Sequence, residues 1–201
     1  MENFNLKNLV FVLSVTNFLL AFVLPTLRSL KKTGVFPVSF NKSDTIQLFI
    51  GNVYFISLLF IFVSSISYSF IYKIYYLLVP ISFLENDIFK IIGIILNQLC
   101  IIWIIIGQAQ MEKSWRIGIF DDEKNLLITD GLFSFSRHPI SIGLIFLMFT
   151  TFICMPNALT LVVFIISFVL VNIEVALEEI ELKSKHGQKY IEYSKKTPKW
   201  I

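Results

Sequence analysis

The chain has 201 residues, of which 56% are hydrophobic and only 15% are charged, and its formal net charge is +3. Soluble domains are about 45–50% apolar and about 25% charged, so this composition excludes an ordinary soluble domain and favours a single domain embedded in lipid. The small net charge gives no indication of a nucleic-acid partner. Cys100 and Cys154 lie inside apolar runs, without a CxxC pair or a histidine spacing that would hold a metal, so we expect buried thiols and no metal site.

The first half of the chain contains two apolar runs of the length that crosses a bilayer, which is about 20 residues. The first run, 8–27, lacks a small-residue cleavage site, so we interpret it as an uncleaved first helix. The polar stretch 28–45 has turn residues and predicts a loop. The second span is predicted over 46–68. The following stretch, 71–84, is aromatic and interrupted by Pro80, which indicates a segment at the membrane interface.

The second half predicts three more spans. The third span is expected over 88–106, with Asp87 as its cap. After a charged stretch with no spanning run, two apolar segments, 139–154 and 158–173, are joined by a short connection that predicts an antiparallel helical hairpin. We therefore expect an all-α integral membrane protein with about five transmembrane helices, a C-terminal hairpin and a cytoplasmic C-terminal helix. The whole chain, 1–201, would form one membrane domain.

Within that domain we expect N-terminal helices over 1–106 and a functional half over 107–201. The distribution of basic residues predicts the orientation. All but three of the Lys and Arg residues fall within the polar segments 28–45, 107–138 and 174–201. Positive residues are concentrated on the cytoplasmic side of membrane proteins. The pattern thus predicts a multi-pass protein of the cell membrane, with its N-terminus outside and its C-terminus in the cytoplasm.

The two C-terminal polar segments contain the residues that could carry chemistry. Arg137 and His138 precede Pro139, and proline is favoured in the first turn of a helix, so both side chains are expected at a helix N-terminus, at the depth of the lipid headgroups. Taken by itself, this triplet is typical of a basic membrane anchor. Asn97, Gln98 and Asn172 lie inside the predicted spans, and we expect hydrogen bonds between helices from them.

The tail is rich in carboxylates next to a membrane segment. At helical spacing Glu174, Glu178 and Glu181 share one face. A second face is expected to contain Glu179, Leu182, His186, Tyr190 and Tyr193. A solvated acidic helix would explain this pattern. However, carboxylates beside a bilayer are unfavourable unless they face a cation or a polar cavity, so a functional role is equally well supported.

Three motifs in a fixed order resemble the isoprenylcysteine carboxyl methyltransferase and phospholipid methyltransferase superfamily. They are LITDGLFSFSRHPISIG over 127–143, the apolar hairpin, and EEIELKSKHGQKYIEYSKKTPKW over 178–200. The family pattern is a Leu-Val-Thr-Ser-Gly run, an Arg-His-Pro-x-Tyr-x-Gly box, a hairpin, and a closing EExxLxxxFGxxYxxYxxxTPxW. The stretch QMEKSWRIG over 110–118 is similar to the bacterial members. The resemblance covers about the C-terminal half of the chain.

Members of this family use S-adenosylmethionine to methylate lipophilic acceptors. The resemblance thus implies this cofactor and a small lipophilic or lipid acceptor, methylated on oxygen or nitrogen, which would enter from the bilayer. The residues it implies for cofactor binding are Asn125, Leu126, Leu127, Ile128, Phe133, His138, Pro139, Ile140, Ser141 and Glu178. A helix N-terminus with His138 would suit the cofactor carboxylate, whereas Glu178 would suit a cationic group. Leu126, Ile128 and Phe133 could pack on the adenine.

Arg137, Glu174 and Glu179 are the residues expected to act in catalysis. The sequence departs from the family pattern at several positions, with Ser141 in place of the usual Tyr, Asn125 in place of His, and Glu174 in place of the arginine of the isoprenylcysteine enzymes. A glutamate at position 174 would repel an acceptor carboxylate and could attract an amine or accept a proton from a hydroxyl.

Two alternatives to a methyltransferase remain at this stage. One is a membrane reductase of the sterol type, which would use NADPH, although the only basic cluster for its 2′-phosphate is Lys113, Arg116 and Lys124. The other is a non-catalytic scaffold or transporter subunit that keeps the same fold. Cofactor binding distinguishes the three possibilities.

Overall fold

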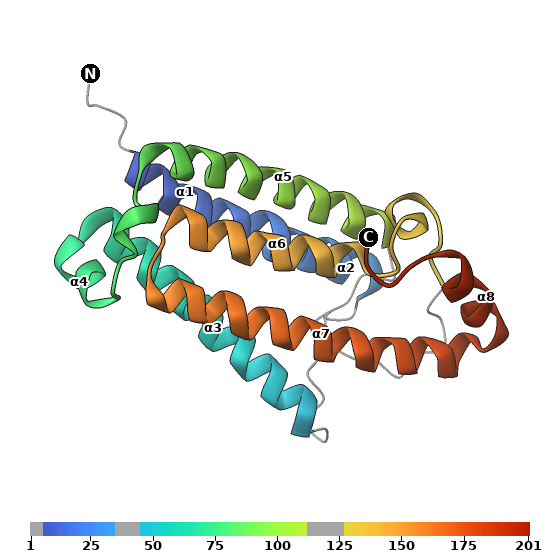
Figure 1. The fold of residues 1–201 in the computed structure, drawn as a ribbon. Coiled ribbons are helices and arrows are strands. Elements are labelled where there is room, and N and C mark those ends of the chain that lie inside the picture. The colour runs from blue at the N-terminus through green and yellow to red at the C-terminus, as the bar shows by residue number, and fades with distance from the viewer. Residues whose placement is uncertain (1–5, 35–44, 112–126) are drawn as a thin grey trace.

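The computed structural model describes residues 6–34, 45–111 and 127–201, which form a bundle of helices (Figure 1). In chain order the elements are α1 (Leu6–Phe18), the π-helical turn η1 (Leu19–Val23), α2 (Leu24–Thr33), α3 (Thr45–Phe70), α4 (Tyr72–Leu77), η2 (Ser82–Leu84), α5 (Asp87–Met111), η4 (Gly131–Ser134), α6 (Pro139–Cys154), α7 (Ala158–His186) and α8 (Gln188–Lys196). The predicted all-α class is confirmed over this part of the chain.

The first helix is longer than predicted. α1, η1 and α2 follow one another without interruption, so the chain is helical up to Thr33, where a loop over 28–45 was expected. Pro25 falls in the first turn of α2, directly after the π-helical turn, where its missing N–H is accommodated. The helix ends at Gly34, which has φ +72° and donates its N–H to the Leu30 carbonyl at 2.8 Å. The prediction placed the end of the first helix too early, because the basic residues before Gly34 are also compatible with a helix.

The stretch 71–84 does not form a span. It contains the short elements α4 and η2, which lie at the end of the bundle next to the α6–α7 turn (Figure 1). Two backbone hydrogen bonds join the two segments, from Ile81 N–H to the Pro156 carbonyl at 2.8 Å and from Ala158 N–H to the Leu78 carbonyl at 3.1 Å. The segment therefore closes one end of the bundle.

The starts of α5 and α7 are capped by asparagines. Asn86, and not Asp87 as predicted, caps α5 by accepting the Phe89 N–H at 2.9 Å. Asp87 instead lies in the first turn and forms an ion pair with Lys90 at 3.0 Å. Asn157 caps α7 through a reciprocal capping box with Thr160. The predicted hairpin of α6 and α7 is confirmed, and α7 continues as one helix from the apolar segment through the acidic residues.

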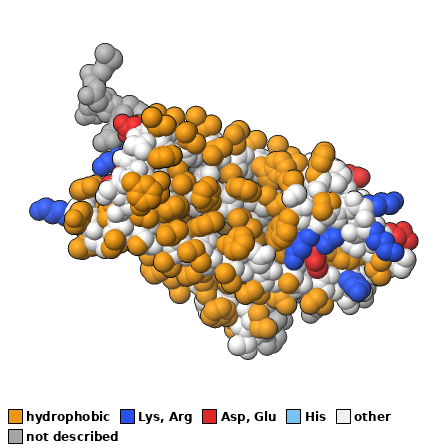
Figure 2. Space-filling model, viewed as in Figure 1, with side chains coloured by type: hydrophobic (Ala, Val, Ile, Leu, Met, Phe, Trp, Pro, Cys, Tyr) orange, Lys and Arg blue, Asp and Glu red, His pale blue; other side chains and the backbone are white. Residues whose placement is uncertain are grey.

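Four of the described helices are long and apolar enough to cross a membrane: α1 to α2 together, α3, α5 and α7. α6 has only 16 residues and is shorter than these four, so the expected five spans correspond to four long helices and one short one. On the face shown in Figure 2, apolar side chains cover most of the surface between the two ends, and charged side chains gather around the end of α7 and α8. The chain is thus a multi-pass membrane protein.

Close contact between α5 and α6 depends on glycine. A Cβ atom added at Gly143 would lie 2.6 Å from Ile104 Cγ1, and one added at Gly107 would lie 2.7 Å from Ile140 Cγ1. Small residues let membrane helices approach closely where no hydrophobic effect drives their association. Trp103 Nε1 also donates to the Pro139 carbonyl at 2.8 Å, at the first turn of α6. These contacts determine where the N-terminus of α6 lies.

Of the three polar residues predicted to join helices, only Asn97 does so within the described ranges. Its side chain accepts from Asn17 Nδ2 on α1 at 2.6 Å and donates to Thr150 Oγ1 on α6 at 2.9 Å. Gln98 donates to its neighbour Asn97 at 3.5 Å. Asn172 donates to the Phe168 carbonyl of its own helix, because it lies on the outer side of α7 and has that carbonyl one turn away.

We predict that Gly143→Ala weakens the bundle, because the added methyl group must displace Ile104 or the backbone. The expected loss in the free energy of unfolding is about 1–3 kcal/mol, the usual effect of overpacking. Denaturant titration in detergent, followed by circular dichroism, measures this loss. Phe146→Leu on the lipid-facing side of the same helix is the control and should stay within about 0.5 kcal/mol of wild type. Equal midpoints for the two variants would contradict the packing role of Gly143.

Candidate functional site

A cavity of about 810 Å³ lies inside the bundle, between α1, α3, α5, α6 and α7. Along α5 it is lined from Ile94 to Met111, a distance of about 26 Å at 1.5 Å per residue. This is close to the roughly 30 Å thickness of a bilayer core. Its lining is mainly apolar around Val10, Ile94 and Met155, and it becomes polar and charged toward the end of α7. The cavity is large enough for a cofactor-sized ligand and a second molecule beside it.

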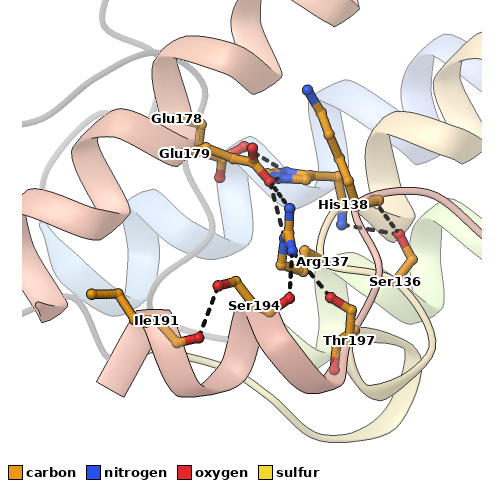
Figure 3. Close-up of polar contacts among 9 residues, drawn as sticks. Ser136, Arg137, His138, Glu178, Glu179, Ile191, Ser194 and Thr197 are labelled. Atoms are coloured by element: carbon orange, nitrogen blue, oxygen red, sulfur yellow. Dashed lines mark hydrogen bonds and ion pairs between the residues drawn. The ribbon is translucent and has the colours of Figure 1, made fainter. Parts of the chain in front are cut away.

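Arg137 joins the three C-terminal segments at the polar end of this cavity (Figure 3). Its guanidinium donates to Glu179 Oε1 on α7, at 3.0 Å from Nε and 2.5 Å from Nη2. Its Nη1 donates to the carbonyls of Ser194 at 3.0 Å and Thr197 at 3.1 Å, at the end of α8. The side chain is only 13% exposed. Arg137 is therefore a structural connection between α6, α7 and α8, and it also contributes to the cavity wall.

His138 is buried behind the cavity, between two carboxylates. Its Nδ1 lies 3.2 Å from Glu178 Oε2 and its Nε2 lies 3.4 Å from Glu179 Oε1 (Figure 3). The ring is 2% exposed, whereas the Glu178 side chain is 48% exposed. From the sequence we expect His138 to suit the cofactor carboxylate, but the ring is turned toward two protein carboxylates. His138 can thus hold Glu178 in place, and Glu178 contacts the cavity.

The structure brings most of the predicted cofactor residues to one cavity. Eight predicted site residues line it: Leu127, Ile128, Phe133, Arg137, Ile140, Ser141, Glu174 and Glu178. Pro139, His138 and Glu179 lie behind the wall. Asn125 and Leu126 lie outside the described residues, as do the basic residues Lys113, Arg116 and Lys124. Leu127, Ile128 and Phe133 give the same cavity an apolar part of its lining.

Glu174 and Glu178 both line the cavity, and Glu181 lines it one turn further on, so the predicted shared face is confirmed. Glu174 accepts a hydrogen bond from the Tyr54 hydroxyl of α3 at 2.7 Å. Arg137 does not pair with Glu174, because its carboxylate partner is Glu179. The Glu174 carboxylate of the cavity thus has its hydrogen-bond partner, Tyr54, in the N-terminal half of the chain.

The second predicted face is interrupted. Leu182 and His186 line the same cavity as Glu178, whereas Glu179 faces Arg137. α7 ends at Gly187, where φ is +52°, so Tyr190 and Tyr193 belong to the separate helix α8. A single helical period assumed across Gly187 is therefore wrong. Burial raises the pKa of Tyr193 to about 12, so its hydroxyl remains a donor, and it donates to the Phe133 carbonyl at 2.5 Å.

Several site residues could not be found from sequence. Ser136 is fully buried, accepts the His138 N–H at 3.1 Å and donates to the Lys199 carbonyl at 3.0 Å. Gln110 accepts the Leu132 N–H at 2.9 Å and so positions the loop before α6. The sequence did not indicate Tyr54 as a site residue, because a tyrosine in an apolar helix has no local motif that distinguishes it from other tyrosines. Among the described residues, no group of three His, Cys, Asp or Glu residues has the arrangement of a metal site.

We predict that Arg137→Met lowers the free energy of unfolding by about 3 kcal/mol, because Glu179 would be left largely buried without its cation. Adding Glu179→Leu should recover part of this loss, but not all of it, since the carbonyls of Ser194 and Thr197 would still lack a donor. A double-mutant cycle in detergent measures the coupling. Lys196→Met removes an exposed cation from α8 and serves as the control. Additive losses would contradict the pairing.

Comparison with known proteins identifies the family. The sequence model of the phospholipid methyltransferase family matches residues 87–189, from the start of α5 into the first turn of α8. The match covers just over half of the chain and includes Arg137, His138, Glu178 and Glu179. A search of curated proteins finds no match. The chain therefore belongs to the phospholipid methyltransferase family, within the superfamily that also contains the isoprenylcysteine carboxyl methyltransferases.

Proposed function

We propose that this membrane methyltransferase transfers a methyl group from S-adenosylmethionine to a lipid-like acceptor held inside the bundle. One observation carries the proposal: a single cavity joins a charged end, built by the family-matched segment, to an apolar interior of nearly bilayer length. A charged, water-soluble methyl donor fits the first part. A lipophilic acceptor fits the second, and it would reach the first without leaving the membrane.

The chemistry of the cavity wall fits the cofactor. S-adenosylmethionine has a flat apolar-faced adenine, an ammonium, a carboxylate and a sulfonium. Leu127, Ile128 and Phe133 offer an apolar surface for the adenine, and Glu178 offers a carboxylate for a cationic group. His186 also lines the cavity, and its Nε2 is buried without a hydrogen-bond partner among the described atoms. That nitrogen can serve a polar group of the ligand.

The residues of this chain would act mainly by positioning. When bound, the cofactor supplies a methyl carbon made electrophilic by its sulfonium. His138 holds Glu178 from behind, Arg137 holds Glu179, and both contacts keep α7 against the start of α6. Alignment of two reactants in one cavity can contribute roughly 7–11 kcal/mol to lowering a barrier. The apolar walls exclude water, which would otherwise compete with the acceptor.

The orientation of the protein in the membrane is part of this proposal. The described basic residues near the ends of α2 and α7 and on α8 indicate that this end of the bundle lies in the cytoplasm. The cofactor is soluble and would then reach the charged end of the cavity directly. The acceptor would come from the lipid.

We predict that detergent-purified protein binds S-adenosylmethionine saturably, and that Glu178→Ala weakens this binding by about tenfold or more, as expected for loss of a charged hydrogen bond. His138→Ala should weaken it as well, because Glu178 would lose the ring that holds it. Isothermal calorimetry measures both constants. Glu192→Ala removes an exposed carboxylate from α8 and should leave binding unchanged. NADPH is titrated in a parallel calorimetry experiment. If the protein binds NADPH but not S-adenosylmethionine, the proposal is contradicted and a reductase is favoured.

A further inference from the structure

A second, smaller pocket lies on the side of α7 that faces away from the cavity, and we refer to it as the outer pocket. Its volume is about 330 Å³. α7 contributes Ala176, Ile180 and Lys183 to its lining, and at about 100° per residue these lie roughly opposite the face of α7 that lines the cavity. Arg137 is the only described residue that lines both spaces. A ligand in the outer pocket would therefore be separated from the cavity by α7 itself.

The charges in the outer pocket do not balance. Three cations, Arg137, Lys183 and Lys199, line it together with one carboxylate, Glu179, which leaves an excess of two positive charges. Glu179 is bonded to Arg137. Within the described ranges Lys183 and Lys199 form no ion pair, although Lys199 Nζ lies 5.5 Å from the centroid of the Trp200 ring. The two lysines are thus available to an anion.

A buried hydroxyl adds a neutral donor to these cations. Tyr190 lines the outer pocket and is 4% exposed, and its hydroxyl has no hydrogen-bond partner among the described atoms. Burial, and to a smaller extent the Glu179 carboxylate nearby, raise the pKa of Tyr190 to about 12, so the hydroxyl keeps its proton at physiological pH. Glu179 is close enough to influence Tyr190, yet no hydrogen bond joins the two. A buried donor without a partner is unfavourable, and a phosphate oxygen in the pocket would accept from it.

An apolar stripe on the outer surface of α7 leads into this pocket. It consists of Val169, Ile173, Ala176 and Ile180, which follow one another at helical spacings of four, three and four residues and are all exposed. Lys183 continues the stripe three residues later. Ile180 lies about 33 Å from the start of α7 at 1.5 Å per residue, close to the roughly 30 Å thickness of a bilayer core. The outer pocket is therefore at the level of the lipid headgroups, where basic side chains meet the apolar surface (Figure 2).

We propose that the outer pocket binds the phosphate headgroup of an anionic phospholipid, which remains bound beside α7 and is not the molecule that is methylated. Its acyl chains would lie along the apolar stripe. Its phosphate would meet Lys183 and Lys199 and accept a hydrogen bond from Tyr190. A membrane lipid fits this place better than a free phosphate, because the stripe connects the pocket to the hydrocarbon region. The cytoplasmic leaflet, where the proposed orientation puts this end of the bundle, is rich in anionic lipids.

The bound lipid would strengthen the contact between α7 and the C-terminal segment. Lys183 belongs to α7, whereas Tyr190 belongs to α8 and Lys199 follows it, so one phosphate would bridge both sides of Gly187. The same segments are joined on the other side by Arg137. A ligand that binds only the folded chain raises its stability. The inference does not depend on the proposed methyltransferase function, because binding of this lipid requires neither the cofactor nor the methyl acceptor.

The test measures lipid binding to the full chain in dodecyl maltoside micelles, without S-adenosylmethionine. Native mass spectrometry compares dioleoyl phosphatidylglycerol with dioleoyl phosphatidylcholine, which have the same acyl chains and differ in net charge. We expect wild type to bind the anionic lipid at least about tenfold more tightly, since two lysines meet its headgroup. Lys183→Ala combined with Lys199→Ala should bring the two affinities to within about twofold of each other. Tyr190→Phe should weaken binding of phosphatidylglycerol without any change in net charge.

The matched control is Lys195→Ala combined with Lys196→Ala, which removes two exposed cations of α8 that do not line the outer pocket. This variant should keep the preference of wild type. If it loses the preference as fully as the pocket variant does, or if wild type binds both lipids equally, the binding is a general effect of charge and the assignment is overturned. Inorganic phosphate and glycerol phosphate are titrated by calorimetry, and either one binding as tightly as the lipid would overturn the lipid in favour of a free anion.

Discussion

The site depends on one buried ion pair, that of Arg137 with Glu179. The guanidinium is the only described side chain that bonds both α7 and the end of α8 while belonging to the loop before α6. Because both partners are largely buried, removal of either leaves a charge or several backbone carbonyls unsatisfied in a poorly solvated region. The pair thus holds together three segments that are far apart in sequence, and His138 and Glu178 acquire their positions as a consequence.

The continuity of α7 has a second consequence. One helix begins at the hairpin turn, passes through the apolar interior and ends at the charged surface, so residues one turn apart lie in very different surroundings. Glu178 is half exposed at the charged end, whereas Glu174 lies deeper and needs the Tyr54 hydroxyl. A carboxylate at that depth is unfavourable unless it has a hydrogen-bond donor or a cation to bind.

Much of the architecture could be predicted from the sequence because the signals are local. Long apolar runs predicted the spans, and the short Met155-Pro156-Asn157 connection predicted the hairpin. The errors occurred where local signals are ambiguous: the first helix passes through basic residues to Gly34, and Asn86 caps α5 although Asp87 is an equally good capping residue by type. The helical period of the tail was extended across Gly187, whose positive φ ends α7.

By itself, the sequence determined the all-α membrane class, the order of the helices and the set of motifs that place the chain in its family, since each of these follows from composition or from residues close together in the chain. Only the tertiary structure decided which of those residues share a cavity. In the folded chain Glu178 lines the cavity, whereas Glu179 pairs with Arg137. His138 lies against two carboxylates, and Tyr54 donates a hydrogen bond to Glu174, which is 120 positions away in the sequence. Such pairings depend on how the helices pack, and packing is set by contacts such as those at Gly107 and Gly143 that no local pattern reveals.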